Sequence, residues 1–497
     1  MLRLLGGSLA VVLLATAASA TAYFEDVGII SDAIGHGVVI KDKALAPTYS
    51  GQPVTILILG SDKRSESEDV YDRSDPRHSD TILLAHLNPQ SGQTTLMSIP
   101  RDLEASYTAN GGEYNDVKIN SAFTYGGAKK TVQVVESLLH LKINDVIVID
   151  FQSFAYLVNG LGCVYVDVDH LYDNPYGTGF AHIYIPPGYR PLCYYQALSY
   201  VRYREGDSTY ARDAREQDFI REAKQQLGIR TNLLTNPSDL NHLIRQLTSN
   251  GGLATNIVGV DATNRLIQIA ESSISEPVRQ IQFPDVGSVS SPTAGSVQLV
   301  PPPAELNAVV QSFLYGNAAN TLKLPAVPKA PSSHRHHRHA SSSGGVAAGL
   351  VAVPSYAYQD AAEMQVHVPF PVEIPHLTSA DGYFPGYDDF YHFKEVVPLT
   401  ATNGGLVYHG YRVTWEDGAV LGAYYGIDGL DWTKPPLFDN ARTESIKGRT
   451  YMFVANGAHD QDIGWIQGSD IYWVSNTVFD NLTNAEMLGI AESARKV

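Results

Sequence analysis

Cysteine and basic residues are both scarce in this chain of 497 residues. Its two cysteines are too few for a disulfide-rich scaffold or for a zinc finger built on cysteine. Lysine and arginine total 35 against 52 aspartate and glutamate, which gives a formal net charge of −17 at pH 7. A protein that binds duplex DNA needs a basic face to displace counterions from the phosphates. We therefore expect no nucleic-acid partner.

Long apolar runs are also scarce, and the one that could span a bilayer lies at the N-terminus. Residues 4–24 contain no acid or base, and Arg3 precedes them. About 20 apolar residues can span a bilayer, and a flanking arginine favours the cytoplasmic side. The pattern predicts a single-pass signal anchor at 1–24, a juxtamembrane stem at 25–52, and an extracytoplasmic chain held at the cell membrane by this N-terminal helix. The small residues 18–20 leave a cleaved signal peptide as the alternative.

Export would permit a disulfide, and Cys163 and Cys193 are the two cysteines available to form it. Closing a loop of this size would stabilise the fold by roughly 3–4 kcal/mol in the chain-entropy description. Two buried, reduced thiols are the alternative.

Apolar runs and helical spacing alternate over residues 53–316. The run at 54–59 predicts a strand buried on both faces. Two further runs, 81–87 and 94–99, flank the turn signal Asn88-Pro89 and predict a hairpin. We also expect a strand at 146–150 and helices at 131–141, 194–201 and 213–227, the last amphipathic and highly charged. Strands alternating with helices predict an α/β fold class, an α-β-α-like sandwich with helices covering the sheet.

The C-terminal third has a different composition. Residues 317–352 are rich in proline, serine and histidine and predict a linker, although the histidine tract at 334–339 leaves metal binding as an alternative. Residues 353–497 show short apolar-alternating runs and many tyrosines and glycines. They predict a separate, small, mostly β module that is dispensable for chemistry and acts in wall-side binding or packing.

Charged residues cluster beside the predicted strands and helices of the 53–316 segment. Asp62 follows the first strand, Asp80 precedes the second, and Arg101 follows the third. Arginine binds phosphoryl oxygens with two parallel hydrogen bonds, and carboxylates hold Mg²⁺ against the same oxygens. The pattern therefore favours phosphate chemistry, while ordinary surface salt bridges are the structural alternative.

The order of these motifs resembles the LytR-CpsA-Psr family of cell-wall phosphotransferases. The resemblance covers about residues 53–230, with a weaker match to about 316. The motifs that carry it are Leu59-Gly60-Ser61-Asp62, Ser79-Asp80-Thr81, Ser98-Ile99-Pro100-Arg101-Asp102, Lys118-Ile119-Asn120-Ser121-Ala122, Gly126-Gly127, Tyr200-Val201-Arg202-Tyr203-Arg204 and the helix start at Arg212-Asp213-Ala214-Arg215-Glu216-Gln217.

The resemblance implies a Mg²⁺-dependent phosphotransferase. It would move an anionic or other glycopolymer from a polyprenyl-pyrophosphate carrier onto peptidoglycan and leave polyprenyl phosphate. The family fold implies a hydrophobic tunnel for the polyprenyl chain, which an aromatic and leucine cluster could line, unless that cluster is ordinary core. The cluster is Phe123, Phe151, Phe154, Tyr156, Leu157 and Leu161.

The resemblance also implies a role for each charged residue. Asp62 and Asp80 would hold Mg²⁺. The catalytic arginines would be Arg101, Arg202 and Arg204, the last two directed to one face of an extended segment. The pyrophosphate would be bound by Lys118, Arg212 and Arg215.

Two positions depart from the family pattern. His78 stands where the family usually has arginine, and Glu216 stands where it has glutamine. The first change removes a permanent charge, and the second is expected to add a negative charge beside phosphates. These departures motivate an alternative function, a polyprenyl-pyrophosphate lipid-binding protein with weak or lost catalysis.

Overall fold

The computed structural model describes residues 23–61, 79–174, 182–203, 207–230, 237–248, 252–273, 278–316, 349–384, 388–394, 407–418 and 421–497. Within these residues no helix is long and apolar enough to cross a membrane. The predicted anchor at 1–24 and the predicted linker at 317–352 lie almost entirely outside them.

Residues 25–52 do not form the predicted juxtamembrane stem. Helix α2 (Tyr23–Gly35) buries Val27, Ile30 and Ile34 in the core of the domain. These residues follow one another at intervals of three and four, so they lie on one helix face, and the core covers that face. The strand β1 (Val38–Val39) then joins the edge of the central sheet.

The central sheet has seven strands in the order β1-β12-β7-β2-β3-β4-β13. Strand β2 (Val54–Ser61) pairs antiparallel with β3 (Ser79–Leu87) and in parallel with β7 (Asp145–Asp150). Strands β3 and β4 (Thr94–Ile99) are antiparallel neighbours, which confirms the predicted hairpin. Strand β4 also pairs in parallel with β13 (Val278–Ile281). The sheet is therefore mixed.

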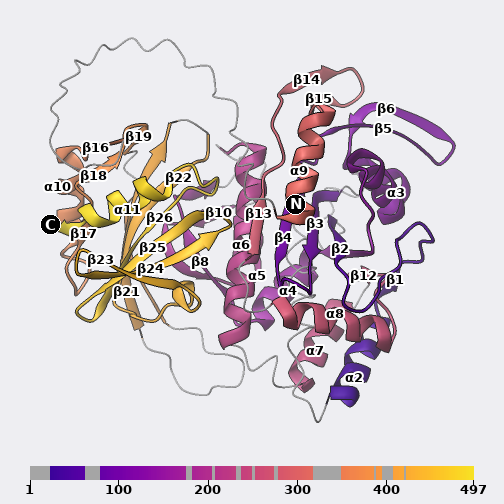
Figure 1. Ribbon diagram of the computed structural model, residues 1–497, viewed down its shortest axis with the longest axis horizontal. Helices are drawn as coiled ribbons and strands as arrows, with labels where there is room; N and C mark the ends of the chain where they lie inside the picture. Colours follow the sequence, from indigo (N-terminus) through magenta and orange to yellow (C-terminus); the bar gives the residue numbers. More distant parts are fainter. Residues whose placement is uncertain are drawn as a thin grey trace.

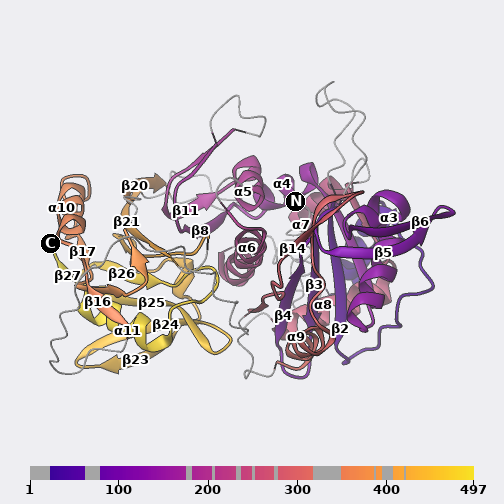
Figure 2. The ribbon, with the colours of Figure 1, turned by 90° about the horizontal axis from the view of Figure 1, so that it is seen from above.

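Helices cover both faces of this sheet, which confirms the predicted α/β sandwich (Figures 1 and 2). On one face Leu57 and Leu59 of β2 pack with α3 (Ser121–Leu139) and α9 (Pro303–Tyr315). The alternate residues of β2 face the opposite cluster, which includes α4 (Phe151–Gly160). All eight residues of β2 are buried because both faces are covered.

The remaining elements of the domain surround this sandwich. Its other helices are α5 (Tyr194–Arg202), α6 (Thr209–Arg230), α7 (Pro237–Thr248) and α8 (Val260–Ser273), and the strand between β1 and β7 is β12 (Leu253–Thr255). Its two-stranded ribbons pair β5 (Glu104–Ala109) with β6 (Gly112–Lys118), β8 (Val164–Val168) with β11 (Gly188–Leu192), β9 (Tyr172–Asn174) with β10 (Ile183–Ile185), and β14 (Ser288–Ser291) with β15 (Gly295–Gln298).

Two helices differ from their predicted form. Helix α3 begins ten residues earlier than expected, with a break at Gly127, whose φ of 63° glycine adopts without a steric penalty. Helix α6 was expected to expose a charged face, yet residues 210–224 are all buried. The C-terminal unit covers the side of α6 that the sequence pattern assigned to solvent.

Cys163 and Cys193 form a disulfide, as the sequence predicted. Cys163 directly precedes β8, and Cys193 is the residue before α5. Their Cα atoms are 4.4 Å apart, within the range of disulfides in proteins. The bond joins the ribbon that follows α4 to the start of the helix that carries Arg202.

The C-terminal unit is built around an eight-stranded antiparallel sheet, which confirms its predicted β-rich character. Its core contains Trp415 and Trp465, both at most 1% exposed. The strands are β19 (Gly382–Tyr383), β20 (Asp388–Lys394), β21 (Val407–Asp417), β22 (Tyr424–Leu430), β23 (Arg442–Ile446), β24 (Arg449–Asn456), β25 (His459–Gln467) and β26 (Asp470–Ser475). Smaller elements at its edge are β16 (Leu350–Ala352), α10 (Ser355–Met364), β17 (Glu373–Ile374), β18 (Leu377–Ser379), η3 (Pro436–Phe438), α11 (Asn484–Ser493) and β27 (Arg495–Lys496).

This unit packs against the first domain through a shared aromatic cluster. Tyr165 of β8 lies 5.5 Å, centroid to centroid, from Trp432, and Tyr189 of β11 lies 5.8 Å from Trp473. Both tyrosines are buried. Figure 2 shows α6 between the C-terminal sheet and the central sheet. The C-terminal unit thus has its own core but is not detached from the first domain.

Candidate functional site

The register of β3 against β4 brings Asp80 and Arg101 together. Ile82 of β3 pairs with Ile99 of β4. In this antiparallel register the residue two positions before Ile82 lies opposite the residue two positions after Ile99. Arg101 Nη1 donates to Asp80 Oδ1 at 2.5 Å. Burial alone would raise the pKa of Asp80, but surrounding positive charges, Arg101 and Arg202 among them, lower it well below its ordinary value. The carboxylate is therefore ionised at neutral pH.

Lys118 approaches the same place from the end of β6. Its Nζ lies 2.9 Å from Asp102 Oδ1, and Arg101 Nε lies 3.6 Å from Asp102 Oδ2. Burial would raise the pKa of Asp102, yet the charges of Arg101 and Lys118 hold it below its ordinary value. The acid thus keeps two cations at a fixed separation.

Arg212, from the first turns of α6, completes this group, which we call the cationic cluster: Arg101, Lys118, Arg202 and Arg212. Arg212 is 1% exposed, and its Nη2 donates to Asp213 Oδ1 at 2.8 Å. Its charge also acts on Asp102, as do the charges of Arg101 and Lys118. Sequence reasoning gave no role to Asp102 or Asp213, although both lie within the motifs.

Glu216, one turn after Arg212, does not add the negative charge expected from the sequence. Its Oε1 lies 4.0 Å from Arg212 Nε and accepts a hydrogen bond of 3.4 Å from Thr81 Oγ1. Burial, reinforced by the charge of Asp213, raises the pKa of Glu216 well above its ordinary value. The neutral acid is close in shape to the glutamine that the family pattern has here. Gln217 instead donates to Ser98 Oγ of β4 at 3.1 Å.

Arg202 is the last residue of α5 rather than part of an extended segment. Its guanidinium lies 4.3 Å from the ring centroid of Phe151, and its charge acts on Asp80. Tyr203 leaves the helix with φ −55° and ψ 139° and packs against Tyr172. Asp62, His78 and Arg204 lie outside the described residues, so the predicted metal pair and arginine pair are each half described.

Arg215, to which the family resemblance assigns pyrophosphate binding, makes its described contacts outside the cationic cluster. It is 1% exposed and forms an ion pair with Asp207. Its Nε donates to Tyr172 Oη at 2.9 Å, and its Nη1 donates to the carbonyl oxygens of Tyr200 and Tyr203 at 3.2 Å each. Those two carbonyls flank Arg202. Arg215 is therefore a positioning residue for the end of α5.

The C-terminal unit is connected to Arg215 through Tyr172 and Asp169. Tyr172 Oη donates to Asp169 Oδ1 at 2.5 Å. Arg412 Nε and Thr414 Oγ1, both on β21, donate to the carbonyl oxygen of Asp169 at 3.1 and 2.8 Å. Sequence reasoning missed this connection, because residues more than 240 positions apart share no local pattern.

Arg412 is also held by carboxylates from both parts of the molecule. Its Nη1 donates to Asp167 Oδ1 of β8 at 2.9 Å and to Asp428 Oδ2 of β22 at 2.5 Å. Asp167 accepts a further hydrogen bond from Trp473 Nε1 at 3.0 Å. The side chain of Arg412 is 1% exposed, so this is a buried ion-paired contact between the two parts.

For a metal ion, the described residues supply only part of a donor set. They contain no group of three or more His, Cys, Asp or Glu that could hold one. Asp80 is an ionised carboxylate beside the cationic cluster, and Mg²⁺ is commonly bound by one or two carboxylates together with substrate phosphates. The oxygen donor therefore fits Mg²⁺.

The family profile of LytR_cpsA_psr matches residues 31–304, more than half of the chain. The chain belongs to the LytR-CpsA-Psr family, and the resemblance seen in the sequence is confirmed. The match includes all of the cationic cluster.

Curated relatives align with part of the chain. An uncharacterised protein of Staphylococcus aureus is 31% identical over 182 residues, 37% of this chain and 44% of that protein. The polyisoprenyl-teichoic acid–peptidoglycan teichoic acid transferase TagU of Halalkalibacterium halodurans is 30% identical over 171 residues, 34% of this chain and 51% of the relative. The chain thus spans about half the length of these relatives. TagU of Enterococcus faecalis is 29% identical over 216 residues, 43% and 67% of the two chains.

Solved structures also align with part of the chain. TagV of Bacillus subtilis is 22% identical with a TM-score of 0.43, over 53% of this chain and 97% of its own. TagT bound to LIIa-WTA is 21% identical with a TM-score of 0.41, over 55% and 96% of the two chains.

Proposed function

We propose that the protein is a phosphotransferase that moves a glycopolymer from a polyprenyl-pyrophosphate carrier onto a hydroxyl of peptidoglycan. The observation that carries this is the cationic cluster, which gathers four cations from the turn after β4, the end of β6, α5 and α6 around Asp80 and Asp102. Membership of a family whose TagU relatives are named teichoic acid transferases supports it. The glycopolymer by analogy with those names is a teichoic acid or another polymer on the same kind of carrier.

In the proposed reaction the acceptor hydroxyl oxygen attacks the phosphorus that bears the polymer. A new phosphorus–oxygen bond forms, the bond to the bridging oxygen breaks, and polyprenyl phosphate leaves with the bonding electrons while the hydroxyl proton is released. Negative charge therefore grows on the bridging oxygen. Asp80 holds Arg101 in place, and the ring of Phe151 holds Arg202. Both arginines can therefore stabilise the growing charge without reorganising.

Asp80, together with Asp62, would hold Mg²⁺. When bound, the ion would neutralise charge on the diphosphate oxygens as a Lewis acid. Lys118 and Arg212 would bind the outer phosphoryl oxygens, where Asp102 and Asp213 keep both cations in place. Arg204 is the third arginine to which the family resemblance assigns a catalytic role.

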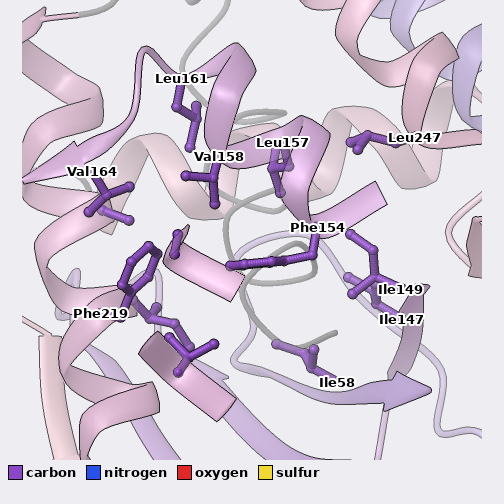
Figure 3. Packing of buried hydrophobic residues seen from close by; sticks show 14 of the residues in the cluster. Ile58, Ile147, Ile149, Phe154, Leu157, Val158, Leu161, Val164, Phe219 and Leu247 are labelled. Atoms are coloured by element: carbon purple, nitrogen blue, oxygen red, sulfur yellow. The ribbon is translucent and has the colours of Figure 1, made fainter. Parts of the chain in front are cut away.

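The apolar side of the site is the layer between the sheet and α4. Figure 3 shows Phe154 of α4 beside Ile147 and Ile149 of β7, while Val158 lies nearer Val164 and Phe219. Phe151 packs against the same cluster, and its ring carries the guanidinium of Arg202. A polyprenyl chain held in this layer would therefore present its pyrophosphate to the arginines.

We also propose that residues 1–24 anchor the chain in the cell membrane and that the rest is extracytoplasmic. The disulfide between Cys163 and Cys193 supports this, because such bonds persist in oxidising compartments outside the cytoplasm. A membrane position would bring the site to its lipid-linked substrate.

The test is a single-turnover assay with purified protein and a synthetic polyprenyl-pyrophosphate oligosaccharide. We expect Mg²⁺-dependent release of polyprenyl phosphate, and loss of that release on chelation. Tight binding of the lipid without turnover at any Mg²⁺ concentration would contradict the proposal and favour the lipid-binding protein that the departures at His78 and Glu216 suggested.

A further inference from the structure

A groove of about 510 Å³ lies between β5 and the second half of α3. Its polar lining is contributed by six residues, and its floor includes Val134 and Leu138. The volume is within the range of small-molecule sites. The six residues are Glu104, Ser106, Thr108, Lys130, Gln133 and Ser137.

The lining has the chemistry of a site for an uncharged sugar chain. Hydroxyl and amide groups dominate it, and its charged residues are one acid, Glu104, and one base, Lys130. Lys130 Nζ already donates to Gln133 Oε1 at 2.7 Å. A polymer that carries a phosphate in every unit would need more cations than this groove offers.

One end of the groove adjoins Lys118 of the cationic cluster. Glu104, at one end of the groove, is the direct cross-strand partner of Lys118 in the β5–β6 ribbon. Tyr107, which also lines the groove, shares a hydrogen bond of 2.5 Å with Ser121 Oγ, and Ser121 Oγ donates to the Lys118 carbonyl oxygen at 2.6 Å. A ligand in the groove therefore lies next to the residue proposed to bind the pyrophosphate.

A stack of three tyrosines stiffens this wall of the groove. The ring of Tyr107 lies 5.3 Å from that of Tyr114, which lies 4.2 Å from that of Tyr125, with planes tilted by 22° and 24°. The stack ties the ribbon to the start of α3. Of the three rings, that of Tyr107 lines the groove, where it offers apolar surface to a sugar beside hydroxyl groups that can form hydrogen bonds.

We propose that this groove binds the acceptor, a glycan strand of peptidoglycan, and positions its hydroxyl toward the cationic cluster. The inference rests on the proposed function and adds to it the place where the second substrate binds. Its near-neutral, hydroxyl-rich lining selects the sugar backbone of the acceptor over the phosphate-bearing donor polymer.

The test introduces bulk into the groove from either wall of the full-length protein. Ser137→Trp fills it from α3 and Thr108→Trp from β5, both at exposed positions where the fold tolerates a large side chain. Ala362→Trp, at an exposed position of α10 in the C-terminal unit, is the matched control. The probes are a lipid-free N-acetylated tetrasaccharide prepared from peptidoglycan and a short polyol-phosphate oligomer.

We expect the wild-type protein and Ala362→Trp to bind the tetrasaccharide, and both groove variants to bind it at least tenfold more weakly. In transfer assays the KM for the acceptor should rise by a similar factor, with a much smaller change in the KM for the lipid donor. Undiminished tetrasaccharide binding by both groove variants would overturn the proposal. So would a groove that binds the polyol phosphate and loses that ligand in the variants.

Different results would contradict the acceptor site and the proposed transferase function. Normal transfer by the wild type with unchanged acceptor KM in both variants contradicts the groove alone. Tetrasaccharide binding that the variants abolish, in a protein that never releases polyprenyl phosphate, supports the groove and contradicts the transferase.

Discussion

Arg202 combines a fixed position with a charge that the proposed reaction uses. Its guanidinium rests on the ring of Phe151, and the carbonyls on either side of it are held by Arg215. A donor fixed in this way helps more in the transition state, where the bridging oxygen gains charge, than in the ground state. Its contribution should therefore appear in the rate of the chemical step.

We expect Arg202→Ala to slow single-turnover release of polyprenyl phosphate about a hundredfold, which corresponds to roughly 3 kcal/mol of barrier. Arg202→Lys should recover only part of the rate, because it keeps the charge but loses the planar fork. Arg245→Ala is the matched control, since Arg245 pairs with Asp32 at the surface. A near wild-type rate for Arg202→Ala would remove this residue from the mechanism.

Glu216 is the second residue whose environment sets its role. Because burial raises its pKa and keeps it neutral, replacing it by the isosteric amide removes no charge at pH 7. We expect Glu216→Gln to turn over within about threefold of wild type between pH 6 and 8. A tenfold gain in donor affinity at pH 8 would show instead that an ionised carboxylate repels the pyrophosphate.

At the scale of elements, the disulfide ties the ribbon after α4 to the start of α5. Neither cysteine touches the cationic cluster, so its effect should be on stability. We expect the Cys163→Ala/Cys193→Ala variant to lose about 3–4 kcal/mol of unfolding free energy, measured by urea denaturation, while the folded fraction keeps nearly the wild-type rate. Two thiols that react with alkylating agents in the unreduced native protein would contradict the bond itself.

Helix α6 is the element that links the site to the rest of the molecule. It carries Arg212 on the side of the cationic cluster and Arg215 on the side of Tyr172. Further along, Gln225 Nε2 donates to the Leu437 carbonyl oxygen of the C-terminal unit at 2.5 Å. A helix so rich in charge stays buried because each neighbour supplies partners for it.

At the scale of the whole molecule, the C-terminal unit is expected to support the site rather than to be dispensable. Removing one partner of a buried ion pair leaves the other charges uncompensated and costs about 3–5 kcal/mol. We expect Arg412→Met to lower the unfolding free energy by this order and to slow lipid release, because Asp169 loses a contact that orders Tyr172 and Arg215.

The matched control is Arg442→Met, which breaks an exposed ion pair with Glu444 within the C-terminal unit. A chain ending near residue 320 should show the same losses as Arg412→Met, or larger ones. Wild-type stability and turnover in Arg412→Met would show that the two parts act independently, as the sequence alone suggested.

The contact between the two parts should also depend on pH. Around Arg221, α6 contributes Asp218 and Glu222, and the C-terminal unit contributes Asp462 and Asp480. Burial raises the pKa of Glu222 to about 8 and that of Asp480 to about 7, against the opposing effect of Arg221. The folded protein therefore binds more protons than the unfolded chain between about pH 4 and these values.

Because the folded protein binds the extra protons, its unfolding free energy is greatest near the pKa values that these acids have in the unfolded chain. It falls as the pH rises toward 8. We expect the unfolding free energy to decrease from pH 5.5 to 8.5, by up to about 1.4 kcal/mol per pH unit for each group. The double variant Glu222→Gln/Asp480→Asn should flatten this dependence. A wild-type stability that rises over the same interval would contradict the protonated form of these acids.

The sequence by itself determined the sheet and the residues that meet at its end. Near-continuous apolar runs at 54–59, 81–87 and 94–99 predict strands buried on both faces, and the short turn after β3 fixes the register that sets Asp80 opposite Arg101. The order of motifs then identified the family, and the count of two cysteines left one possible disulfide pair. All of these features depend on local spacing or on composition.

Only the tertiary structure decided where the charges of α6 point and what covers them. The family resemblance assigned Arg212 and Arg215 the same role, yet in the fold one donates to Asp213 and the other to Tyr172. It also placed Arg412 against Asp169, 243 residues away in the chain. Such contacts leave no periodic signal, because the partner that satisfies a buried charge is chosen by how the elements pack and not by neighbours in the chain.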